Sequence, residues 1–555
     1  MHRWTRGSLR AVPVAGLLAA GLAAGMAAPA AAQASGPTVK FNSQVNMTAP
    51  APPSGLVDNF PQNKQNEPSI TLDPATGALV AGSNDEIDEP LCTGAGTAAS
   101  PGSCPFAPGV GISGVYLSSD GGASWTQPAF AGQCGKTIHT LPGYCQQGLE
   151  SFGDPVLAVG PALPGCHLGT GKVVYYGNLA FPAGSAVPVV AVSRSTDDGA
   201  TWLSPVVASS TTNPVDFNDK DYVWADDNPH SPFYGTVYVS WTLFQGAGNF
   251  GRSGTFSPEP IVVARSTDCG ATWTMAMRLS QSANNSAVGG RQGSVIRTGP
   301  DGTVYVFWEG AIFRHPEILV AVSHDGGVSF SRPIPVAAVT DLPSPLPGSS
   351  FRDNSNPAAD VNQATGQVYV TWANWDPATQ TAFILFTQSS DGGQTFSAPV
   401  TIGGRAAAFN AFFPAIAASP DGTHVFVSWP AQTWQPAGTA PGPGVVTQIA
   451  AFNLLTVGSG FSGAALLSTA SGDPDGSSTN GLSAQFLGDY TAAVATNTAG
   501  IGVWTDTRNE TPCPAVDAFR AGTTSVRPNP DTQCPPSGTG RLFGNSDIFA
   551  GGVGF

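Results

Sequence analysis

The chain has 555 residues, including 68 glycines and 49 prolines, and only 11% of its residues are charged. The formal net charge of −15 disfavours nucleic acids and polyanionic glycans as partners. The length exceeds that of an ordinary compact domain, and long helical periodicity is missing after the first residues, so we exclude a helical bundle and expect an all-β repeat protein.

Residues 1–34 are typical of a secretory signal peptide. Arg3, Arg6 and Arg10 precede the apolar run AVPVAGLLAAGLAAGMAA, and Ala32-Gln33-Ala34 forms a cleavage site of the A-x-A type. A membrane anchor is the alternative, but the run is short for a span. We therefore expect a secreted, extracellular protein with no membrane span once the signal is removed.

The segment TVKFNSQVN at 38–46 alternates apolar and polar residues, as a half-buried strand does. It has no partner strand of its own. The far end of the chain reads TAAVAT, IGVWTD and DIFAGGV, which is one strand short of a four-stranded sheet. We predict that residues 38–46 supply the missing strand and join the two ends of the chain.

Five related octapeptides recur along the chain: SSDGGASW at 118–125, STDDGATW at 195–202, STDCGATW at 266–273, SHDGGVSF at 323–330 and SSDGGQTF at 389–396. Each follows an apolar stretch. Aspartate accepts backbone N–H groups inside a turn, and glycine supplies a positive φ, so each octapeptide predicts a strand, a tight turn and a second strand. Arg194 and Arg265 directly precede two of these turns, where we expect them to pair with surface carboxylates.

A second repeated element fills the space between the octapeptides: GTVYVSW at 235–241, GTVYVFW at 302–308, GQVYVTW at 366–372 and THVFVSW at 423–429. Valine and aromatic residues alternate there, as on a half-buried strand. Each unit then reads as four antiparallel strands, and we find seven units. Radial closure of such units predicts a seven-bladed β-propeller, with six blades as the alternative.

The predicted organisation is a signal peptide at 1–34, a closing strand with a proline-rich linker at 35–60, and the propeller at 61–555. Eight cysteines in a secreted chain indicate disulfides. Local spacing favours Cys92–Cys104, Cys134–Cys145 and Cys513–Cys534, which leaves Cys166 with Cys269. Zinc is the rival, but no C-x-x-C or H-E-x-x-H pattern occurs.

The octapeptides resemble the Asp box, or BNR repeat, of sialidases and related propeller proteins, and the resemblance covers most of the mature chain. It implies a sialidase-like propeller in which each Asp box stabilises a blade hairpin and lies away from the active site. The box aspartates are therefore expected to be structural, and they are Asp120, Asp197, Asp268, Asp325 and Asp391.

The resemblance also implies a carbohydrate site. In that family three arginines hold a carboxylate, a tyrosine acts as nucleophile with the help of a glutamate, and an aspartate serves as acid and base. The matching substrate-binding residues are Arg291, Arg352 and Arg508, and the matching catalytic residues are Tyr490, Glu309 and Asp85. The family's first arginine position holds Glu67 here, within NEPSI, so Arg508 takes that role in the prediction.

Residues that open the innermost strands are expected to gather at one rim of the channel: Glu67, Asp154, Asp219, Asp221, Arg291, Arg352, Asn354, Asn356, Asp489 and Tyr490. Asp85, Glu309 and Arg508 end second strands and are expected on the opposite rim or in flanking loops. We expect no cofactor. A Ca²⁺ ion held by Glu67, Asp154, Asp219 and Asp489 is the alternative, because calcium takes several oxygen ligands.

The sequence thus predicts a secreted, monomeric protein that acts on, or binds, extracellular carbohydrate or glycoconjugates. A glycoside hydrolase of the exo-sialidase type is one interpretation. A non-catalytic propeller that recognises glycan or protein is the second, and a polysaccharide lyase is the third. An enzyme requires the arginines and Tyr490 to converge in one pocket.

Overall fold

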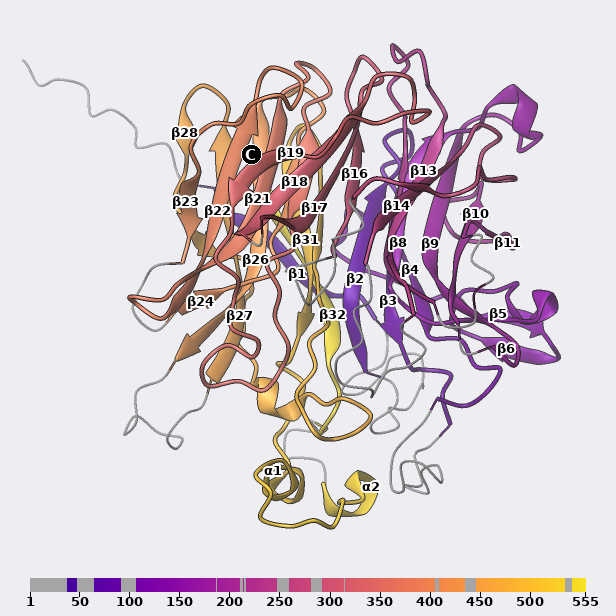
Figure 1. Ribbon diagram of the computed structural model, residues 1–555. Coiled ribbons are helices and arrows are strands. Elements are labelled where there is room, and N and C mark those ends of the chain that lie inside the picture. Colours follow the sequence, from indigo (N-terminus) through magenta and orange to yellow (C-terminus); the bar gives the residue numbers. More distant parts are fainter. Residues whose placement is uncertain are drawn as a thin grey trace, which may run out of the picture. The chain divides into compact units, whose positions relative to one another are not determined.

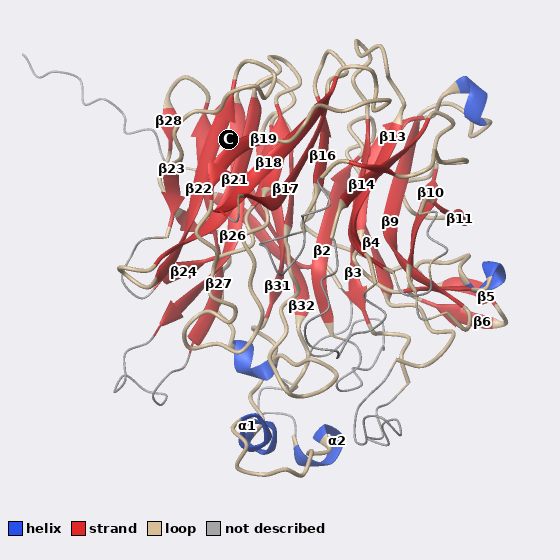
Figure 2. Cartoon of the chain, in the orientation of Figure 1, coloured by secondary structure: helices blue, strands red, loops and turns tan. Residues whose placement is uncertain are grey.

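Antiparallel strands make up nearly all of the regular secondary structure of the described chain, and loops connect them (Figures 1 and 2). The structure is a computed structural model that describes residues 37–46, 64–90, 106–185, 187–209, 213, 216–246, 259–280, 292–313, 315–404, 409–434, 446–534 and 542–555. The predicted signal peptide, Arg291, Cys92 and Cys104 lie outside these ranges. Among the described residues, no helix is both long and apolar enough to cross a membrane.

Within the described ranges the strands form seven blades, as predicted. Blade 1 contains β2 (Gln65–Leu72), β3 (Leu79–Asp85) and β4 (Ser113–Ser118), and an edge bridge between Leu117 and Thr126 takes the place of a fourth strand. Blade 2 contains β8 (Val156–Pro161), β9 (Lys172–Pro182), β10 (Val189–Ser195) and β11 (Leu203–Val207), and β7 (Leu149–Ser151) also pairs with β9. Blade 3 contains β12 (Phe217–Ala225), β13 (Val237–Phe244), β14 (Ile261–Ser266) and β15 (Met277–Arg278).

The remaining blades follow the same order. Blade 4 contains β16 (Val295–Thr298), β17 (Val304–Ile312), β18 (His315–Ser323) and β19 (Ile334–Ala338). Blade 5 contains β20 (Ala358–Val361), β21 (Val368–Asp376), β22 (Thr381–Ser389) and β23 (Val400–Gly403). Blade 6 contains β25 (Ala415–Ala418), β26 (His424–Trp434), β27 (Val446–Thr456), β28 (Gly460–Phe461) and β29 (Ala465–Leu466), and β24 (Phe409–Ala411) also pairs antiparallel with β26.

Blade 7 joins the two ends of the described chain. It contains β30 (Ala492–Ala495), β31 (Ala499–Asp506), β32 (Asp547–Gly554) and β1 (Val39–Gln44), with β1 antiparallel to β32. The prediction that residues 38–46 complete the last sheet is confirmed. Each innermost strand contacts the next, from β2 through β8, β12, β16, β20 and β25 to β30, and β30 contacts β2 again, which closes the ring.

The five octapeptides form nearly identical turns between third and fourth strands. In blade 4, Asp325 accepts hydrogen bonds from the hydroxyls of Ser323 and Ser329 and from the Ser329 backbone, and Gly327 N–H donates to Ser323 Oγ. The hydroxyl of Ser329 and its backbone N–H lower the pKa of Asp325 to about 2. The Asp325 carboxylate therefore accepts several of the hydrogen bonds that hold its turn together.

The second strands are more buried than the sequence predicted. Strands β13, β17 and β21 bury both faces over most of their length, because neighbouring blades pack against each face. The prediction of half-buried strands was wrong for this reason. The largest side chains at these interfaces are fully buried tryptophans, one on each of five second strands: Trp241, Trp308, Trp372, Trp429 and Trp504.

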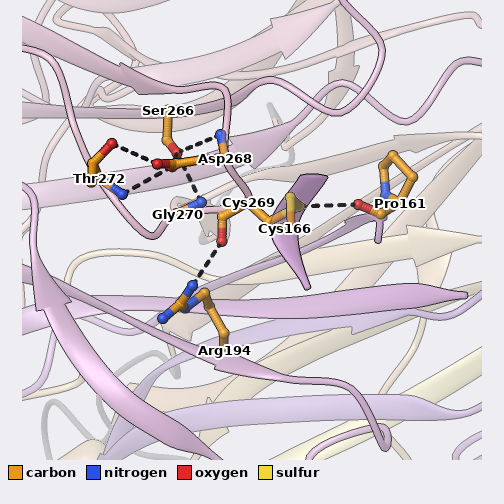
Figure 3. Close-up of a disulfide and its surroundings, with 8 residues drawn as sticks. All are labelled: Pro161, Cys166, Arg194, Ser266, Asp268, Cys269, Gly270 and Thr272. Carbon is orange, nitrogen blue, oxygen red and sulfur yellow. Dashed lines mark hydrogen bonds between the residues drawn. A yellow bond between two sulfur atoms is a disulfide. The ribbon is translucent and has the colours of Figure 1, made fainter. Parts of the chain in front are cut away.

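Disulfides connect Cys134 to Cys145, Cys166 to Cys269 and Cys513 to Cys534, which confirms three predicted pairs. Cys269 belongs to the Asp turn of blade 3, while Cys166 lies in the short 3₁₀ helix η2 (Pro164–Cys166) of blade 2, so this bond joins two blades (Figure 3). Arg194 of blade 2 also reaches this turn and donates to the Cys269 carbonyl oxygen at 3.4 Å. The expected pairing of Arg194 with a surface carboxylate is therefore not what the structure shows.

The few helices lie in connections. The connection between β31 and β32 carries α1 (Pro514–Arg520) and α2 (Pro530–Gln533), which the Cys513–Cys534 disulfide links. Short 3₁₀ helices occur at η1 (Cys145–Gln147) and η5 (Pro474–Gly476), and β5 (Phe130–Gln133) pairs with β6 (Lys136–Ile138) in a separate hairpin. Arg520 of α1 donates to backbone oxygens of Asp475, Ser477 and Leu482, which anchors the helix to the loop before β30.

Candidate functional site

A cavity of about 390 Å³ lies between the innermost strands of the blades. Its lining includes residues from β2, β8, β12, β16, β20, β25 and β30, so it is the central channel of the propeller. We call the end of the channel where these strands begin the mouth. The cavity lining there includes Lys220, Asn354, Asn356, Asp489 and Tyr490.

Several innermost strands begin with a residue in the left-handed region. The φ angles of Glu67, Asp154 and Lys220 are 56°, 52° and 52°. Strand pairing slips at two of these points, between Asn66 and Ser69 and between Asp219 and Tyr222. Left-handed backbone costs a residue with a Cβ on the order of 1 kcal/mol, and such strain is concentrated at functional sites. These bulges place charged residues at the mouth.

Glu67 is the most constrained acid of the mouth. Its side chain is buried, and Oε2 accepts a 2.9 Å hydrogen bond from Asn84 Nδ2. Oε1 lies 3.7 Å from a guanidinium nitrogen of Arg352, and the carboxyl group also hydrogen-bonds with that of Asp154. Burial, followed by the carboxylates of Asp154 and Asp489, raises the pKa of Glu67 well above its ordinary value.

Arg352 pairs with Asp489 across the mouth. Its Nε donates to Asp489 Oδ1 at 2.7 Å, and its Nη2 donates to Oδ2, which is the bidentate arrangement that suits a guanidinium and a carboxylate. The Arg352 side chain is 58% exposed and stacks over the Phe486 ring, with 4.9 Å from Cζ to the centroid. Asn354 adds a hydrogen bond from Nδ2 to the Asp489 carbonyl oxygen.

Two further acids belong to the start of β12. Asp221 is fully buried and neither of its carboxylate oxygens has a hydrogen-bond partner. Burial, followed by the charge of Asp154, raises its pKa well above the ordinary value. Asp219 is half-buried, and burial together with Asp154 and Asp489 raises its pKa as well. Carboxyl groups are thus crowded at the mouth.

Tyr490 lies among these acids. Lys220 Nζ is 3.3 Å from the centroid of the Tyr490 ring, and the phenol donates to the Pro155 carbonyl oxygen at 3.4 Å. Burial, followed by the charges of Asp154 and Glu67, raises the pKa of Tyr490 well above its ordinary value. The phenol is therefore held in its neutral form, and any attack by its oxygen requires a carboxylate to accept the proton.

Of the residues predicted for the site, the structure brings Arg352 and Tyr490 to the mouth. Of the other described residues expected at this rim, Asn354, Asn356 and Asp489 line the cavity. Glu67, Asp154, Asp219 and Asp221 are not among its lining residues, although Glu67 lies 3.7 Å from Arg352 and Asp154 accepts a hydrogen bond from the Lys220 backbone. Arg291 lies outside the described residues.

Asp85, Glu309 and Arg508 do not line the cavity. Asp85 pairs in register with Gln65, so it lies at the same end of blade 1 as Glu67 and not at the opposite rim. Its two oxygens accept four hydrogen bonds, from Gln65, Tyr116, Gln127 and the Ile87 backbone. Such a satisfied carboxylate stabilises the blade.

Glu309 is buried on β17, opposite Ile318, and its backbone N–H donates to the Gln292 carbonyl oxygen. Arg508 forms two hydrogen bonds to Asp506, and its Nη2 also donates to Asn42 of the closing strand. Its guanidinium stacks over Phe549. These contacts hold the Arg508 side chain against other residues of blade 7.

Metal ligation was the alternative for the acidic rim. The described part of the chain contains no group of three or more His, Cys, Asp or Glu side chains arranged to hold a metal ion. The charges of Asp154 and Asp489 raise the pKa of both Glu67 and Asp219, but the four side chains do not form such a group.

No protein-family profile matches the chain, and no curated protein sequence is similar to it. Solved structures with a similar fold include the α-L-arabinanase of Penicillium chrysogenum bound to arabinobiose, which is 13% identical with a TM-score of 0.41 over 71% of this chain and 94% of the other. The leech intramolecular trans-sialidase is 13% identical with a TM-score of 0.40 over 66% and 65% of the two chains. A protein of unknown function from Dyadobacter fermentans is 15% identical with a TM-score of 0.39 over 72% and 94%. At these values the activities of those proteins do not transfer to this chain, and the propeller assignment rests on the strand pairing above.

Sequence reasoning had placed Glu67 at the rim but gave it no catalytic role, and it missed Lys220. A signal for Glu67 was present in the acid–proline pairs Glu67-Pro68 and Asp154-Pro155, which open the first two blades. The position of Lys220 over Tyr490 depends on a bulge in β12 and on contact between strands 270 residues apart, so no local pattern reveals it.

Proposed function

We propose that the protein is a secreted glycoside hydrolase whose catalytic centre is the mouth of the channel. The observation that carries this proposal is the pair of Glu67 and Asp154: Glu67 is buried, its pKa is raised, and its carboxyl group hydrogen-bonds with that of Asp154. Glycoside hydrolysis needs two carboxyl groups whose environments differ, one to donate a proton and one that stays ionised.

Glu67 is the proton donor in this proposal. Its raised pKa keeps the proton at a pH where an ordinary glutamate has lost it. Because the side chain is buried and hydrogen-bonds with Asp154, transfer of the proton to the glycosidic oxygen requires the bound sugar to displace that contact. The hydrogen bond from Asn84 to Oε2 orients the group. As the bond to the leaving group breaks, positive charge develops at the anomeric carbon.

Asp154 stabilises that positive charge. The Lys220 backbone N–H donates to Asp154 Oδ2 at 3.0 Å, and Asp154 N–H donates to Asn84 Oδ1, so the residue is held from two sides. A fixed carboxylate next to a developing oxocarbenium ion lowers the barrier by electrostatic preorganisation. Asp154 then accepts a proton from the attacking water or bonds to the sugar itself.

A tyrosine nucleophile is the alternative that the sequence suggested. Tyr490 has carboxylate neighbours that could take its proton, since Asp154 and Glu67 both act on its charge. The substrate carboxylate of sialic acid, however, would meet cations that are already engaged: among the described residues, Arg352 is paired with Asp489, Arg297, which lines the cavity, is paired with Asp360, and Lys220 lies over the Tyr490 ring. We therefore propose a sugar without a carboxylate.

Secretion is part of the proposal. Disulfides form and persist mainly in oxidising compartments, so the three disulfides of the described chain support this proposal. One of them, Cys166–Cys269, links two blades.

The test is turnover of fluorogenic glycosides that differ in sugar and anomer, with a sialoside included. We expect Glu67→Gln and Asp154→Asn each to reduce kcat by about a hundredfold or more, in line with the usual contribution of acid–base groups. Tyr490→Phe separates the two mechanisms, because it abolishes turnover only if the phenol is the nucleophile. Asp325→Asn, in a turn of blade 4, is the control and should keep kcat. If the wild type binds glycans but hydrolyses none, the protein is a binding propeller and the hydrolase proposal is wrong.

A further inference from the structure

The connection between β31 and β32 begins and ends in two segments that lie side by side. Asn509 Nδ2 donates to Asp547 Oδ2 at 2.7 Å, and Thr511 N–H donates to the Leu542 carbonyl oxygen at 3.2 Å. Leu542 N–H in turn donates to the Asn509 carbonyl oxygen. These hydrogen bonds hold the segment that follows β31 against the segment that precedes β32.

The first segment carries Glu510, a deeply buried carboxyl group. Its side chain is 2% exposed, and within the described chain neither of its carboxylate oxygens has a hydrogen-bond partner. The charge of Arg520 acts on Glu510, but this arginine donates its hydrogen bonds to backbone oxygens of the loop before β30. A buried carboxylate without a partner is strongly unfavourable, and protonation alone does not satisfy it because the O–H of the acid then needs an acceptor.

The second segment adds further buried polar atoms. Asn545 is 3% exposed, and in the part of the chain that the structure describes neither its Oδ1 nor its Nδ2 forms a hydrogen bond. The hydroxyl of Ser546, which is 1% exposed, is also without a partner among the described residues. Folded proteins pair nearly all such groups with other protein groups or with a bound species. Three neighbouring side chains of this kind therefore point to a ligand.

Gly476 of η5 links the two segments. A Cβ on Gly476 would lie 2.5 Å from Glu510 Cβ and 3.2 Å from Glu510 Oε2, so only glycine allows this approach. The Gly476 carbonyl oxygen accepts a 2.6 Å hydrogen bond from the N–H of Gly544, the residue before Asn545. Glu510 and the neighbour of Asn545 thus contact the same residue.

The charge and the chemistry of these groups favour a hard cation. Burial, followed by the charges of Asp547 and Asp473, raises the pKa of Glu510 well above its ordinary value, and a bound cation would relieve this repulsion. Carboxylate, amide and hydroxyl oxygens are the ligands that Ca²⁺ takes, commonly about six to eight of them. A site with one carboxylate among neutral oxygens differs from a cluster of three or more acids, histidines or cysteines, a kind that the described chain lacks.

We propose that Glu510, Asn545 and Ser546 bind a calcium ion, with Glu510 as the charged ligand. The ion would fix the connection between β31 and β32 on the mouth side of blade 7. The Ser546 carbonyl oxygen also accepts a 2.8 Å hydrogen bond from Gln65 N–H at the start of β2, two residues before Glu67, so the ion would support the first blade as well. This site does not depend on the proposed hydrolysis.

The test compares calcium binding and thermal stability of the chelator-treated protein. Titration calorimetry with CaCl₂ should show one calcium ion per chain, bound at least about tenfold more weakly by Asn545→Ala. About 5 mM CaCl₂ should raise the melting temperature of the wild type by about 3 °C or more over NaCl of equal ionic strength, because a ligand that binds only the folded state stabilises it.

Glu510→Gln should reverse the order of the melting temperatures. Without calcium it should melt above the wild type, because the uncompensated buried charge is gone, and calcium should raise its melting temperature by less than about 1 °C. Glu86→Gln is the matched control. Glu86 is also buried, but its Oε1 lies 3.1 Å from Lys64 Nζ, so this variant should keep the full response to calcium.

Each result either supports or overturns the proposal. A wild type that neither binds calcium nor gains stability from it would mean that water fills the space, and the proposal would be wrong. A full calcium response in Glu510→Gln would place the ion elsewhere and would also overturn it. Should Glu510→Gln fail to fold, the calorimetry of Asn545→Ala decides, since unchanged calcium affinity there contradicts the site.

Discussion

Aspartates and glutamates occupy two regions of this molecule with opposite surroundings. In the turns between third and fourth strands, each carboxylate accepts hydrogen bonds from hydroxyls and backbone N–H groups, and the pKa values of Asp120, Asp325 and Asp391 fall to about 2. At the channel mouth, Glu67 and Asp221 are buried beside other acids, and their pKa values rise. The charge of the same functional group is thus stabilised where several donors surround it and disfavoured where burial and neighbouring acids dominate.

The two regions also differ in how they are assembled. A turn is built from residues at most six positions apart, so each copy repeats the same hydrogen bonds. The mouth is built from the starts of several blades, which lie far apart in the sequence. Local structure therefore conserves the turn geometry from blade to blade, while every blade brings a different residue to the mouth.

The difference between the two regions is tested most directly by neutralising one acid in each and comparing the effects on kcat. Glu67→Gln should reduce kcat by about a hundredfold to ten-thousandfold, because it removes the proton donor. Asp325→Asn should leave kcat within about twofold, since Asp325 lies in a turn of blade 4. Steady-state kinetics on the best substrate measure both. Equal losses in the two variants would remove the distinction between reactive and bracing carboxylates.

The turn of blade 1 differs from the other four because the closing strand lies on it. Ser43 Oγ donates to the Gly122 carbonyl oxygen at 2.5 Å, and the Phe41 ring fills the space that a Cβ on Gly122 or Gly552 would occupy. Phe41→Ala should therefore lower the free energy of unfolding by about 2 to 3 kcal/mol. Lys40→Ala, on the exposed face of the same strand, should change it by less than about 0.5 kcal/mol. Denaturant titration compares them, and equal effects would mean that ring closure does not depend on this packing.

A smaller effect concerns the turn aspartates and pH. Asp325→Ala should lower the melting temperature by a few degrees at neutral pH, because four turn hydrogen bonds to the carboxylate are lost. The folded pKa of about 2 lies below that of an unfolded aspartate, so this contribution is complete above about pH 4 and is lost as the pH falls towards 2. Melting curves of both proteins should therefore converge at low pH. A difference that stays constant with pH would show that the carboxylate charge is not involved.

The smallest expected effect is on the pH dependence of stability at Glu67, and its sign is opposite to that at Asp325. The pKa of Glu67 is raised on folding, so its contribution to stability is complete below the unfolded pKa and is lost as the pH rises through the folded pKa. Glu67→Gln avoids this loss and should melt at a slightly higher temperature than the wild type as the pH increases. A lower melting temperature for Glu67→Gln across this range would indicate that Glu67 is a bracing group like the turn aspartates.

Local patterns were sufficient to predict the architecture. Repeated octapeptides, the strands ending in tryptophan and an unpaired segment at 38–46 determined seven blades, the bracing role of the five turn aspartates and the closing strand. These features depend on backbone hydrogen bonds and on alternation over a few residues, which the sequence shows directly. The gathering of first-strand residues at one rim followed from the same repeat.

Only the tertiary structure decided which polar side chains form hydrogen bonds within a blade and which lie near the channel mouth. Asp85 receives four hydrogen bonds within its blade, and Arg508 binds Asp506 and the closing strand, so neither lines the channel. Glu67 lies beside Asp154, Arg352 and Asp489, each contributed by a different blade or the loop before it. Burial and long-range charge set the chemistry of these groups, and both depend on how the blades close into a ring, which no local stretch of sequence encodes.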